Sequence, residues 1–347
     1  MPYYATIRRI EEKAARLRTV GGLQRLRAAL QGESGIPTRT ATETLLLATW
    51  NIREFDSRKY GGRTEEAFLY IAEIVSRFDL IAIQEVRDNL YALQHLQQLL
   101  GTWWSYLVTD VTLGSAGNSE RLAFLYDKRK VQFSGLAAEI VLPESKKAPT
   151  VQLARSPYVA GFRCGWAQIN LCTVHIYYGK AIRVDPRRLA EITNIATTLA
   201  KYSSHFTSGR VPTPEGESDV KENLLLLGDF NIFNREDATM KALQAAKFIV
   251  PERLQSIPGS NVEKNRHYDQ IAYLKNLYGM TPTGRAGVFD YYEYVYRDED
   301  EPAYHASWTK TKARGFREWR TYEMSDHLPM WCEFLIDEAD EYLKRVR

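Results

Sequence analysis

Short apolar runs that end in polar residues constrain the fold of this chain more than any other feature. Residues 224–227 are four consecutive leucines, and the sequence GDFN follows them directly. A continuous apolar run of this length is typical of a strand that is buried on both faces. Side chains two apart on a strand point the same way, so Asp229 and Asn231 can aim at one target if the chain stays extended. The sequence therefore predicts a rigid buried strand that holds a carboxylate and an amide at its tip.

The same pattern recurs along the chain and indicates a protein that mixes strands with a few helices. Further strands are expected at residues 44–50, 80–86, 121–127, 161–169, 170–178, 268–274 and 329–336. Apolar residues at helical spacing predict helices at 64–79 and 187–206, and residues 208–222 are expected to form a polar surface loop. Strand and helix do not alternate regularly, so the pattern is not a simple parallel α/β repeat.

The composition is typical of a globular protein in a reducing compartment. Of the 347 residues, 44% are hydrophobic and 26% are charged, and the formal net charge is only +3. Cys164 and Cys172 could pair across a hairpin, but free thiols are the favoured interpretation for these two and for Cys332. The N-terminus lacks the apolar core of a signal peptide, and no run of about 18 apolar residues occurs. We therefore expect a cytoplasmic protein without a membrane span.

The first 44 residues differ from the rest in charge. They hold eight Lys or Arg against four Glu, so the remaining residues sum to −1. Residues 5–30 have helical spacing, with Gly21 and Gly22 expected to separate two halves, and a linker follows. We expect a basic amphipathic helical extension and linker at 1–44, a catalytic domain at 45–337 and a charged tail at 338–347. The basic face is either solvated or binds DNA, another protein or a second copy, and removal of residues 1–40 is expected to leave the fold intact.

Polar residues gather at the ends of the predicted strands. They are Asn51, Glu85, His175, Asp229, Asn231, Asp269, Asp326 and His327. The carboxylates and amides offer hard oxygen ligands, which suit Mg²⁺, Mn²⁺ or Ca²⁺ better than zinc. The two histidines can donate and accept protons near neutral pH. Because the sequence has no phosphate-binding glycine loop and no GxSxG motif, this set indicates metal-assisted hydrolysis of a phosphate ester.

Five motifs resemble those of a known superfamily. In order, TWNIREF, IAIQEVRD, GDFN, YDQIAY and SDHLP are similar to motifs of the endonuclease/exonuclease/phosphatase superfamily, and most of all to its deoxyribonuclease I branch. The resemblance covers about residues 45–336. It implies an α/β (α+β) four-layer sandwich, in which helices flank two packed mixed β-sheets, here with an N-terminal helical extension.

The resemblance also implies how the metal and the phosphate are bound. Glu85 matches the main metal ligand, with Asn51 beside it, and Asp326 matches a ligand of a second metal. Asp229 and Asn231 match the pair that orients the attacking water and the scissile phosphate. The implied cofactor is Mg²⁺ or Mn²⁺, with Ca²⁺ as an alternative structural or second ion.

Two histidine–carboxylate pairs are implied in the same way. His327, with Asp269 as its partner, matches the histidine that contacts the phosphate. His175, paired with Glu120, matches the histidine that protonates the leaving oxygen. A carboxylate behind each imidazole sets the tautomer and raises the pKa of the histidine.

The nucleic-acid contacts of this branch are matched only in part. Arg87 and Arg155 stand where the branch has arginines against the nucleic-acid backbone, but Asn118 stands where it has a tyrosine that enters the minor groove. Residues 297–323 look like an insertion, in which basic residues alternate with aromatic ones. This segment either stacks on single-stranded nucleic acid or is a surface loop pinned by its own aromatic rings.

Three functions are consistent with these patterns. The leading hypothesis is a divalent-metal-dependent DNA endonuclease that nicks the phosphate backbone of DNA, or of RNA, with low sequence specificity. The alternative is a phosphodiesterase or phosphatase that acts on a small phosphorylated molecule, which the charge of −1 outside the first 44 residues keeps open. A non-catalytic nucleic-acid-binding module is the third hypothesis, and it is disfavoured because no expected site residue is missing.

Overall fold

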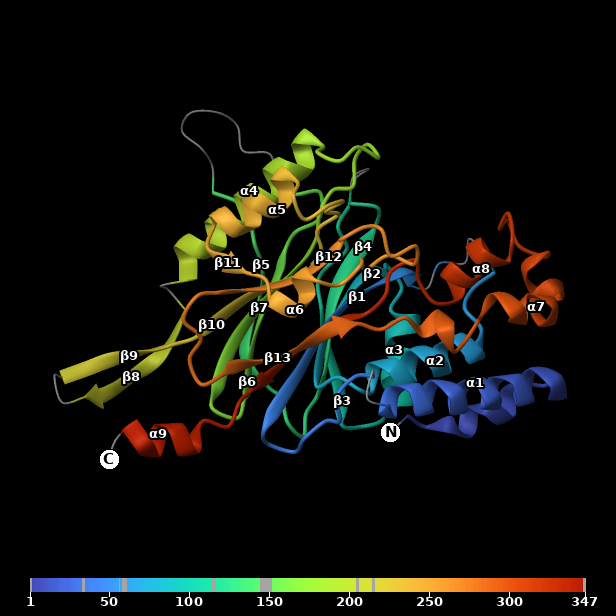
Figure 1. Ribbon diagram of the computed structural model, residues 1–347, viewed down its shortest axis with the longest axis horizontal. Helices are drawn as coiled ribbons and strands as arrows, with labels where there is room; N and C mark the ends of the chain where they lie inside the picture. The colour runs from blue at the N-terminus through green and yellow to red at the C-terminus, as the bar shows by residue number, and fades with distance from the viewer. Residues whose placement is uncertain are drawn as a thin grey trace.

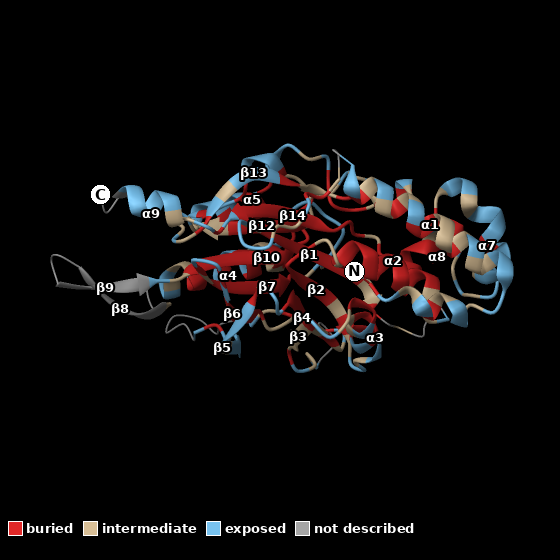
Figure 2. Cartoon of the chain, turned by 90° about the horizontal axis from the view of Figure 1, so that it is seen from below, coloured by how far each residue is buried: buried red, intermediate tan, exposed pale blue. Residues whose placement is uncertain are grey.

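Two six-stranded β-sheets form the centre of the molecule, and helices flank them (Figure 1). The computed structural model describes residues 2–32, 35–55, 57, 61–113, 117–143, 152–203, 206–213 and 216–345. The predicted α/β sandwich of two packed mixed sheets is confirmed. In Figure 2 the middle of both sheets and helix α2 (Glu65–Val75) are buried, whereas α1 (Lys13–Gln31), α7 (Glu301–Trp308) and α9 (Ala339–Arg345) carry exposed residues on their outer sides.

The first sheet has one parallel pair, β1 and β2, among antiparallel neighbours. In spatial order its strands are β13 (Thr281–Val288), β14 (Met330–Leu335), β1 (Thr44–Phe55), β2 (Leu80–Arg87), β4 (Glu120–Asp127) and β3 (Trp104–Val108). Helices α2 (Glu65–Val75) and α3 (Tyr91–Leu100) follow β1 and β2 along the chain. Thr64 caps α2 by accepting a hydrogen bond from the backbone N–H of Ala67.

The second sheet also has one parallel pair, β7 and β10. Its spatial order is β11 (Phe248–Ile249), β12 (Asp269–Leu274), β10 (Asn223–Asp229), β7 (Ala167–His175), β6 (Tyr158–Cys164) and β5 (Gln132–Glu139). Its helices are α4 (Pro186–Tyr202), α5 (Ala238–Ala245) and α6 (Glu252–Gln255). The parallel strands of each sheet end at the same edge, so their last residues come together.

Two boundaries in this half of the chain were predicted wrongly. The turn between β6 and β7 falls at Gly165, which has φ +55°, and not between residues 169 and 170. Residues 208–222 are not a loop, because β8 (Thr207–Thr213) and β9 (Gly216–Lys221) pair as an antiparallel hairpin. The polar composition of this segment concealed the hairpin, because the segment lacks the alternation of apolar residues by which a strand is predicted.

The N-terminal segment forms one long helix, α1 (Lys13–Gln31), after a short 3-10 helix, η1 (Tyr4–Arg9). The expected break at Gly21 and Gly22 is wrong, because α1 runs through both residues. A Cβ atom at Gly22 would lie 2.1 Å from the Tyr70 hydroxyl oxygen, so this glycine lets α1 approach α2 closely. Leu23, Leu26 and Leu30 are buried in a core cluster that they share with α2 and β1.

Arginines of the N-terminal segment pair with acids of the main body. Arg18 lies 3.2 Å from Glu66 of α2, and Arg39 lies 2.7 Å from Asp79. These pairs, together with the buried leucines, contradict the expectation that residues 1–40 can be removed without loss of the fold. The domain boundaries after residues 44 and 337 stay predictions.

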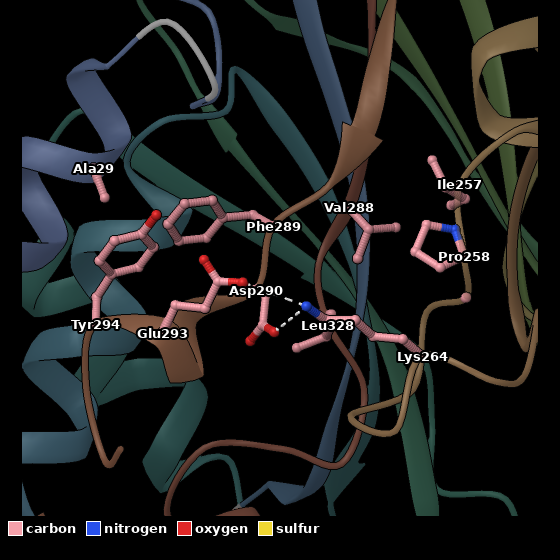
Figure 3. A pocket seen from close by; sticks show the side chains of 11 residues that line it. Ala29, Ile257, Pro258, Lys264, Val288, Phe289, Asp290, Glu293, Tyr294 and Leu328 are labelled. Carbon is pink, nitrogen blue, oxygen red and sulfur yellow. Dashed lines mark hydrogen bonds and ion pairs between the residues drawn. The ribbon is translucent and has the colours of Figure 1, made fainter. Parts of the chain in front are cut away.

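A cavity of about 210 Å³ lies where α1 meets the segment after β13 (Figure 3). Ala29 of α1 lines it together with Phe289 and Tyr294. Lys264 crosses the cavity to Asp290, with 2.7 Å between Nζ and Oδ2. The predicted site residues are not among those that line this cavity.

Residues 297–323 fold into η5 (Asp298–Asp300), α7 (Glu301–Trp308) and α8 (Phe316–Glu323), close to the N-terminal half of α1. Tyr304 and Trp319 are buried in the same cluster as α1 and α2, and the Arg18 guanidinium lies 4.2 Å from the centre of the Tyr304 ring. The structure therefore favours the second interpretation of this segment, a surface element pinned by its own aromatic rings.

The cysteines, the apolar character of the helices and the C-terminal helix complete the description of the fold. Cys164, Cys172 and Cys332 are buried free thiols. Within the described ranges, no helix is both long enough and apolar enough to cross a lipid bilayer. The chain ends with helix α9 (Ala339–Arg345).

We expect α1 to contribute directly to the stability of the fold. Replacement of fully buried Leu26 by alanine should lower the free energy of unfolding by about 2–5 kcal/mol, because it leaves a cavity against α2. Urea denaturation measures this difference. Leu17→Ala is the matched control, since Leu17 lies on the same helix and is 62% exposed. Equal effects of the two substitutions would show that α1 does not belong to the core.

Candidate active site

The site forms where the two parallel strand pairs end, one pair in each sheet. Alternation along β1 explains why Asn51 faces the second sheet. Leu45 and Leu47 pack in the cluster between the sheets, whereas Leu46 and Trp50 pack on the helical side. Asn51 has the parity of Leu45 and Leu47, so its amide points toward the second sheet.

Asn51 bridges the two sheets. Its amide nitrogen donates to Glu85 Oε1 at 2.9 Å and to Asp229 Oδ2 at 3.0 Å. Its amide oxygen is buried and has no hydrogen-bond partner among the described residues. Because a buried acceptor without a partner is costly, this oxygen is a candidate ligand for a cation.

Glu85 reaches the site through a bulge. Its φ of +62° is uncommon for a residue other than glycine, and the register between β2 and β4 shifts between Ile83 and Val86. The bulge turns the carboxylate toward Asn51, and Oε2 accepts a hydrogen bond from the Glu54 backbone N–H at 2.7 Å. Burial raises the pKa of Glu85, and a cation at this position would lower it again.

The tip of β10 is held tightly against β7. Gly228 has φ +131°, and a Cβ atom there would lie 2.2 Å from the Val174 carbonyl oxygen, so only glycine fits. Asn231 also has a positive φ, +52°, and its side-chain amide donates to the Ile176 carbonyl at 2.8 Å. The turn after the leucine strand is therefore fixed at two points.

Asp229 is the point where the polar groups meet. Its Oδ2 atom lies 3.5 Å from His175 Nε2 and 3.8 Å from His327 Nε2. Its Oδ1 atom accepts a hydrogen bond from the Asn231 backbone N–H at 2.8 Å. Both imidazoles thus direct Nε2 toward the same carboxylate oxygen.

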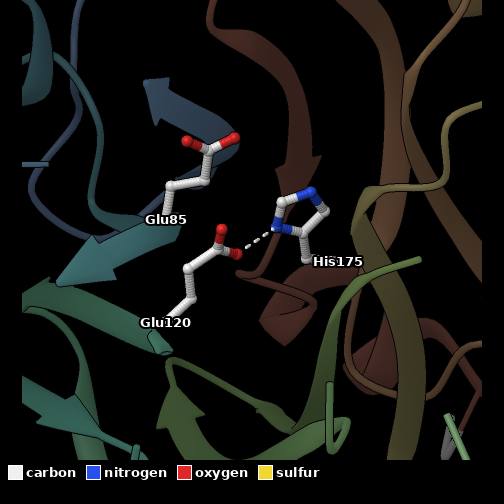
Figure 4. A group of neighbouring side chains, drawn as sticks. All are labelled: Glu85, Glu120 and His175. Carbon is white, nitrogen blue, oxygen red and sulfur yellow. Dashed lines mark ion pairs between the residues drawn. The ribbon is translucent and has the colours of Figure 1, made fainter. Parts of the chain in front are cut away.

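His175 is backed by Glu120 (Figure 4), with 2.9 Å between His175 Nδ1 and Glu120 Oε2. Arg155 Nε donates to Glu120 Oε2 at 2.6 Å, and Asn118 Nδ2 donates to Oε1 at 2.6 Å. Although burial opposes ionisation, His175 and Arg155 lower the pKa of Glu120 to about 2. Asn118 therefore helps to hold the carboxylate that supports His175.

His327 is backed by Asp269, with 2.9 Å between Nδ1 and Oδ2. Its backbone carbonyl accepts hydrogen bonds from the Trp50 indole and the Tyr291 hydroxyl, each at 2.9 Å. Burial alone would lower the pKa of His327, but the carboxylates of Asp269 and Asp229 raise it well above its ordinary value. The two carboxylates thus favour the protonated imidazole, and the contact with Asp269 fixes its orientation.

Three other predicted residues lie at the margin of this group. The Asp326 side chain is 44% exposed, and its Oδ2 lies 3.8 Å from Arg53 Nε. Arg87 is half-buried and donates to the Asn118 carbonyl at 3.1 Å. The Arg155 side chain is only 11% exposed and is engaged with Glu120.

Sequence reasoning missed the residues that hold the site from behind. Ser325 Oγ donates to the Asn51 carbonyl at 2.6 Å and accepts from the His327 N–H at 3.0 Å. Ser260 Oγ accepts from the Asp269 N–H at 3.0 Å. Ser325 lies inside the SDHLP motif and could have been suspected, whereas Ser260 lies in a stretch without any chemical signature.

Two groups of side chains could each hold a metal ion. In each group the ligand atoms lie within 4.8 Å of one another, and the members are Glu85, Glu120 and His175, and Asp229, Asp269 and His327. Glu85 and Asp229, which both accept a hydrogen bond from the Asn51 amide nitrogen, are the candidate carboxylate ligands at the centre of the site. These are oxygen donors, which Mg²⁺ and Mn²⁺ prefer.

A model of the Endonuclease/Exonuclease/phosphatase family matches residues 48–285. The chain belongs to this family. Enzymes of the family are hydrolases that use a divalent metal, and the two ligand groups agree with that chemistry.

Relatives within the family include several deoxyribonucleases. A deoxyribonuclease of Thioalkalivibrio sp. (strain K90mix) is 28% identical over 299 residues, which are 85% of this chain and 72% of that protein. Deoxyribonuclease-1 of Canis lupus familiaris is 26% identical over 219 residues, 62% of this chain and 66% of that protein. The resemblance to the deoxyribonuclease I branch is thereby confirmed.

A solved structure shows the same fold. It is a conserved protein of unknown function from Enterococcus faecalis V583, which superposes with a TM-score of 0.55 at 18% identity. The match covers 84% of this chain and 100% of that protein.

We expect the stability of the metal-free protein to depend on the Glu120 contacts. Because the folded pKa of about 2 lies below the ordinary glutamate value of about 4.3, the carboxylate stabilises the fold above that value. The contribution disappears as the pH falls toward 2. Glu120→Gln should therefore lower the free energy of unfolding near pH 6, and this difference should shrink as the pH is lowered.

Urea titrations with a chelator, at several values between about pH 6 and pH 3, measure this difference. Glu252→Gln is the control, because Glu252 is an exposed glutamate on α6. A difference between wild type and Glu120→Gln that stays constant over this range would contradict the assignment.

Proposed function

We propose that this protein is a divalent-metal-dependent phosphodiester hydrolase that nicks DNA with low sequence specificity. The observation that carries the proposal is the convergence of two histidine–carboxylate pairs on Asp229 Oδ2, beside Asn51 and Glu85. The deoxyribonuclease relatives support DNA as the substrate.

Glu85 and Asn51 would hold the metal ion, with Asp326 as the candidate ligand for a second one. A bound Mg²⁺ or Mn²⁺ would neutralise the negative charge that develops on the phosphoryl oxygens. Ca²⁺ in a structural or second-ion role stays a prediction. Burial raises the pKa of Glu85, and a cation bound beside this carboxylate would favour its ionised form.

The proton steps would be divided between three side chains. Asp229 would accept a proton from the attacking water as the water oxygen forms its bond to phosphorus, and Asn231 would orient the phosphate beside it. His175, whose Nδ1 atom lies 2.9 Å from Glu120 Oε2, would give an Nε2 proton to the leaving oxygen as the P–O bond breaks. His327, kept cationic by Asp269, donates a hydrogen bond to a phosphoryl oxygen.

The two predicted nucleic-acid contacts would have different roles. Arg155 is buried against Glu120, so its proposed role is to hold that carboxylate and not to bind the DNA backbone. Arg87 is half-buried and makes one hydrogen bond, to a backbone carbonyl, so it can turn toward a phosphate. Binding of a phosphate backbone should weaken steeply as the salt concentration rises.

Two other hypotheses for the function of this site can be distinguished from DNA nicking by experiment. The site could also hydrolyse a small phosphorylated molecule, and the family name includes phosphatases. A non-catalytic module is disfavoured, because each of the two histidines lies 2.9 Å from a carboxylate and faces Asp229 with its other ring nitrogen.

We expect supercoiled plasmid to be nicked in the presence of Mg²⁺ or Mn²⁺ and not in the presence of a chelator. His327→Ala should lower the nicking rate about 10²- to 10⁴-fold, because it removes a positioned acid group. Gel electrophoresis of the relaxed product measures the rate. His305→Ala is the matched control, since His305 is an exposed histidine on α7.

Two outcomes would count against the proposal. Equal activity of His327→Ala and His305→Ala would exclude His327 from the chemistry. Absence of nicking, combined with chelator-sensitive release of phosphate from a small ester, would favour the phosphatase hypothesis.

A further inference from the structure

An aromatic cluster that the proposed chemistry does not use lies directly beside His327. The Tyr268 ring centre lies 5.4 Å from the centre of the His327 imidazole, with 32° between the ring planes. Tyr178 and Phe233 complete the cluster, and their ring centres lie 6.2 and 5.6 Å from that of Tyr268. The three rings continue outward from the catalytic imidazole.

The sheet topology brings these rings to the catalytic edge. Tyr178 follows β7 three residues after His175, and Phe233 follows β10 two residues after Asn231. Tyr268 immediately precedes β12, and its carbonyl accepts a hydrogen bond from the Phe230 N–H at 2.8 Å. All three rings therefore belong to the edge of the second sheet that carries the site.

The three rings of the cluster differ in their exposure to solvent. Phe233 is only 4% exposed and forms its base, Tyr268 is half-buried, and Tyr178 is 41% exposed. If the cluster served only to stabilise the core, all three rings could be buried and none would need to reach solvent. Part of the Tyr178 ring, at the outer end of the cluster, is therefore accessible to a ligand from solvent.

A buried arginine holds Tyr178 in position. Arg188 is completely buried, its Nη1 atom donates to the Tyr178 carbonyl at 3.1 Å, and its Nη2 atom donates to the Ile182 carbonyl. Its guanidinium carbon lies 4.4 Å from the centre of the Phe233 ring. A loop fixed in advance loses little conformational entropy when a ligand binds.

Positive charge lies beside the rings. The Arg266 guanidinium carbon lies 4.9 Å from the centre of the Phe233 ring, and the Arg266 side chain is half-buried. Lys180 is exposed on the loop that carries Tyr178. Aromatic rings beside cationic groups bind single-stranded nucleic acid, because bases stack on the rings and phosphates pair with the cations.

We propose that Tyr178 and Tyr268 form a base-stacking subsite that takes an unpaired nucleobase next to the scissile phosphate. This inference rests on the proposed phosphodiester hydrolysis. In an intact duplex the faces of the bases are covered by their neighbours, so this subsite is filled only where the strand is single, frayed or distorted. The enzyme therefore prefers single-stranded segments of its substrate.

Steady-state cleavage of a single-stranded oligonucleotide and of the same sequence as a duplex tests the preference. Tyr178→Ala should raise KM for the single strand about tenfold, and the effect should fall on KM and not on kcat. Tyr178→Phe keeps the ring and should stay within about twofold of wild type. Tyr278→Ala is the matched control, because Tyr278 is 43% exposed and lies at the opposite end of β10, beside Asn223.

A binding measurement separates this inference from the proposed function. A single strand with one 2-aminopurine is mixed with the protein in the presence of a chelator, and stacking on Tyr178 should quench its fluorescence. Tyr178→Ala should lose most of the quenching, whereas Tyr178→Phe and Tyr278→Ala should keep it.

Equal behaviour of Tyr178→Ala and Tyr278→Ala in both assays would overturn the subsite, as would equal KM values for single strand and duplex in the wild type. Quenching that depends on Tyr178 without any turnover would support the subsite and contradict the hydrolase assignment.

Discussion

The whole site depends on how the two sheets are stacked, because three of its central contacts join one sheet to the other. Asn51 of the first sheet donates to Asp229 of the second, and His175 of the second contacts Glu120 of the first. His327, just before β14 of the first sheet, contacts Asp269 of the second. A shift of one residue between the sheets would separate all three pairs. The apolar cluster between the sheets therefore positions the chemistry, as well as stabilising the fold.

Charged groups are buried at this edge, and each has a specific counterpart. Glu120 has Arg155 and His175, and Asp269 has His327. An unpaired buried charge is costly, so these pairs offset the cost of burying charge at this edge. Positive φ values at Glu85 and Asn231 add local strain, which a tightly packed surrounding can sustain at a functional site.

The N-terminal segment and residues 297–323 both pack in the helical layer on the first sheet. Arg18 of α1 connects Glu66 of α2 with Tyr304 of α7, so the N-terminal segment and residues 297–323 stabilise one another. Arg18 and Arg39, which made the N-terminal segment look like a binding surface, form ion pairs with acids of the main body instead. The single-stranded preference that we propose comes from the other side of the site, where Tyr178 and Tyr268 lie beside His327.

The sequence by itself determined most strands, the family and the identity of the candidate site residues, because buried strands and their polar ends leave local patterns. Only the tertiary structure decided that Gly22 joins helices and does not separate them, that Arg155 holds Glu120, and that Asp326 lies at the margin. It also revealed Arg188 and Tyr178, whose neighbours are far away in the chain or have no distinctive spacing. Local patterns record which face of an element is buried, but the partner of a side chain depends on how distant elements pack, and no local pattern carries that information.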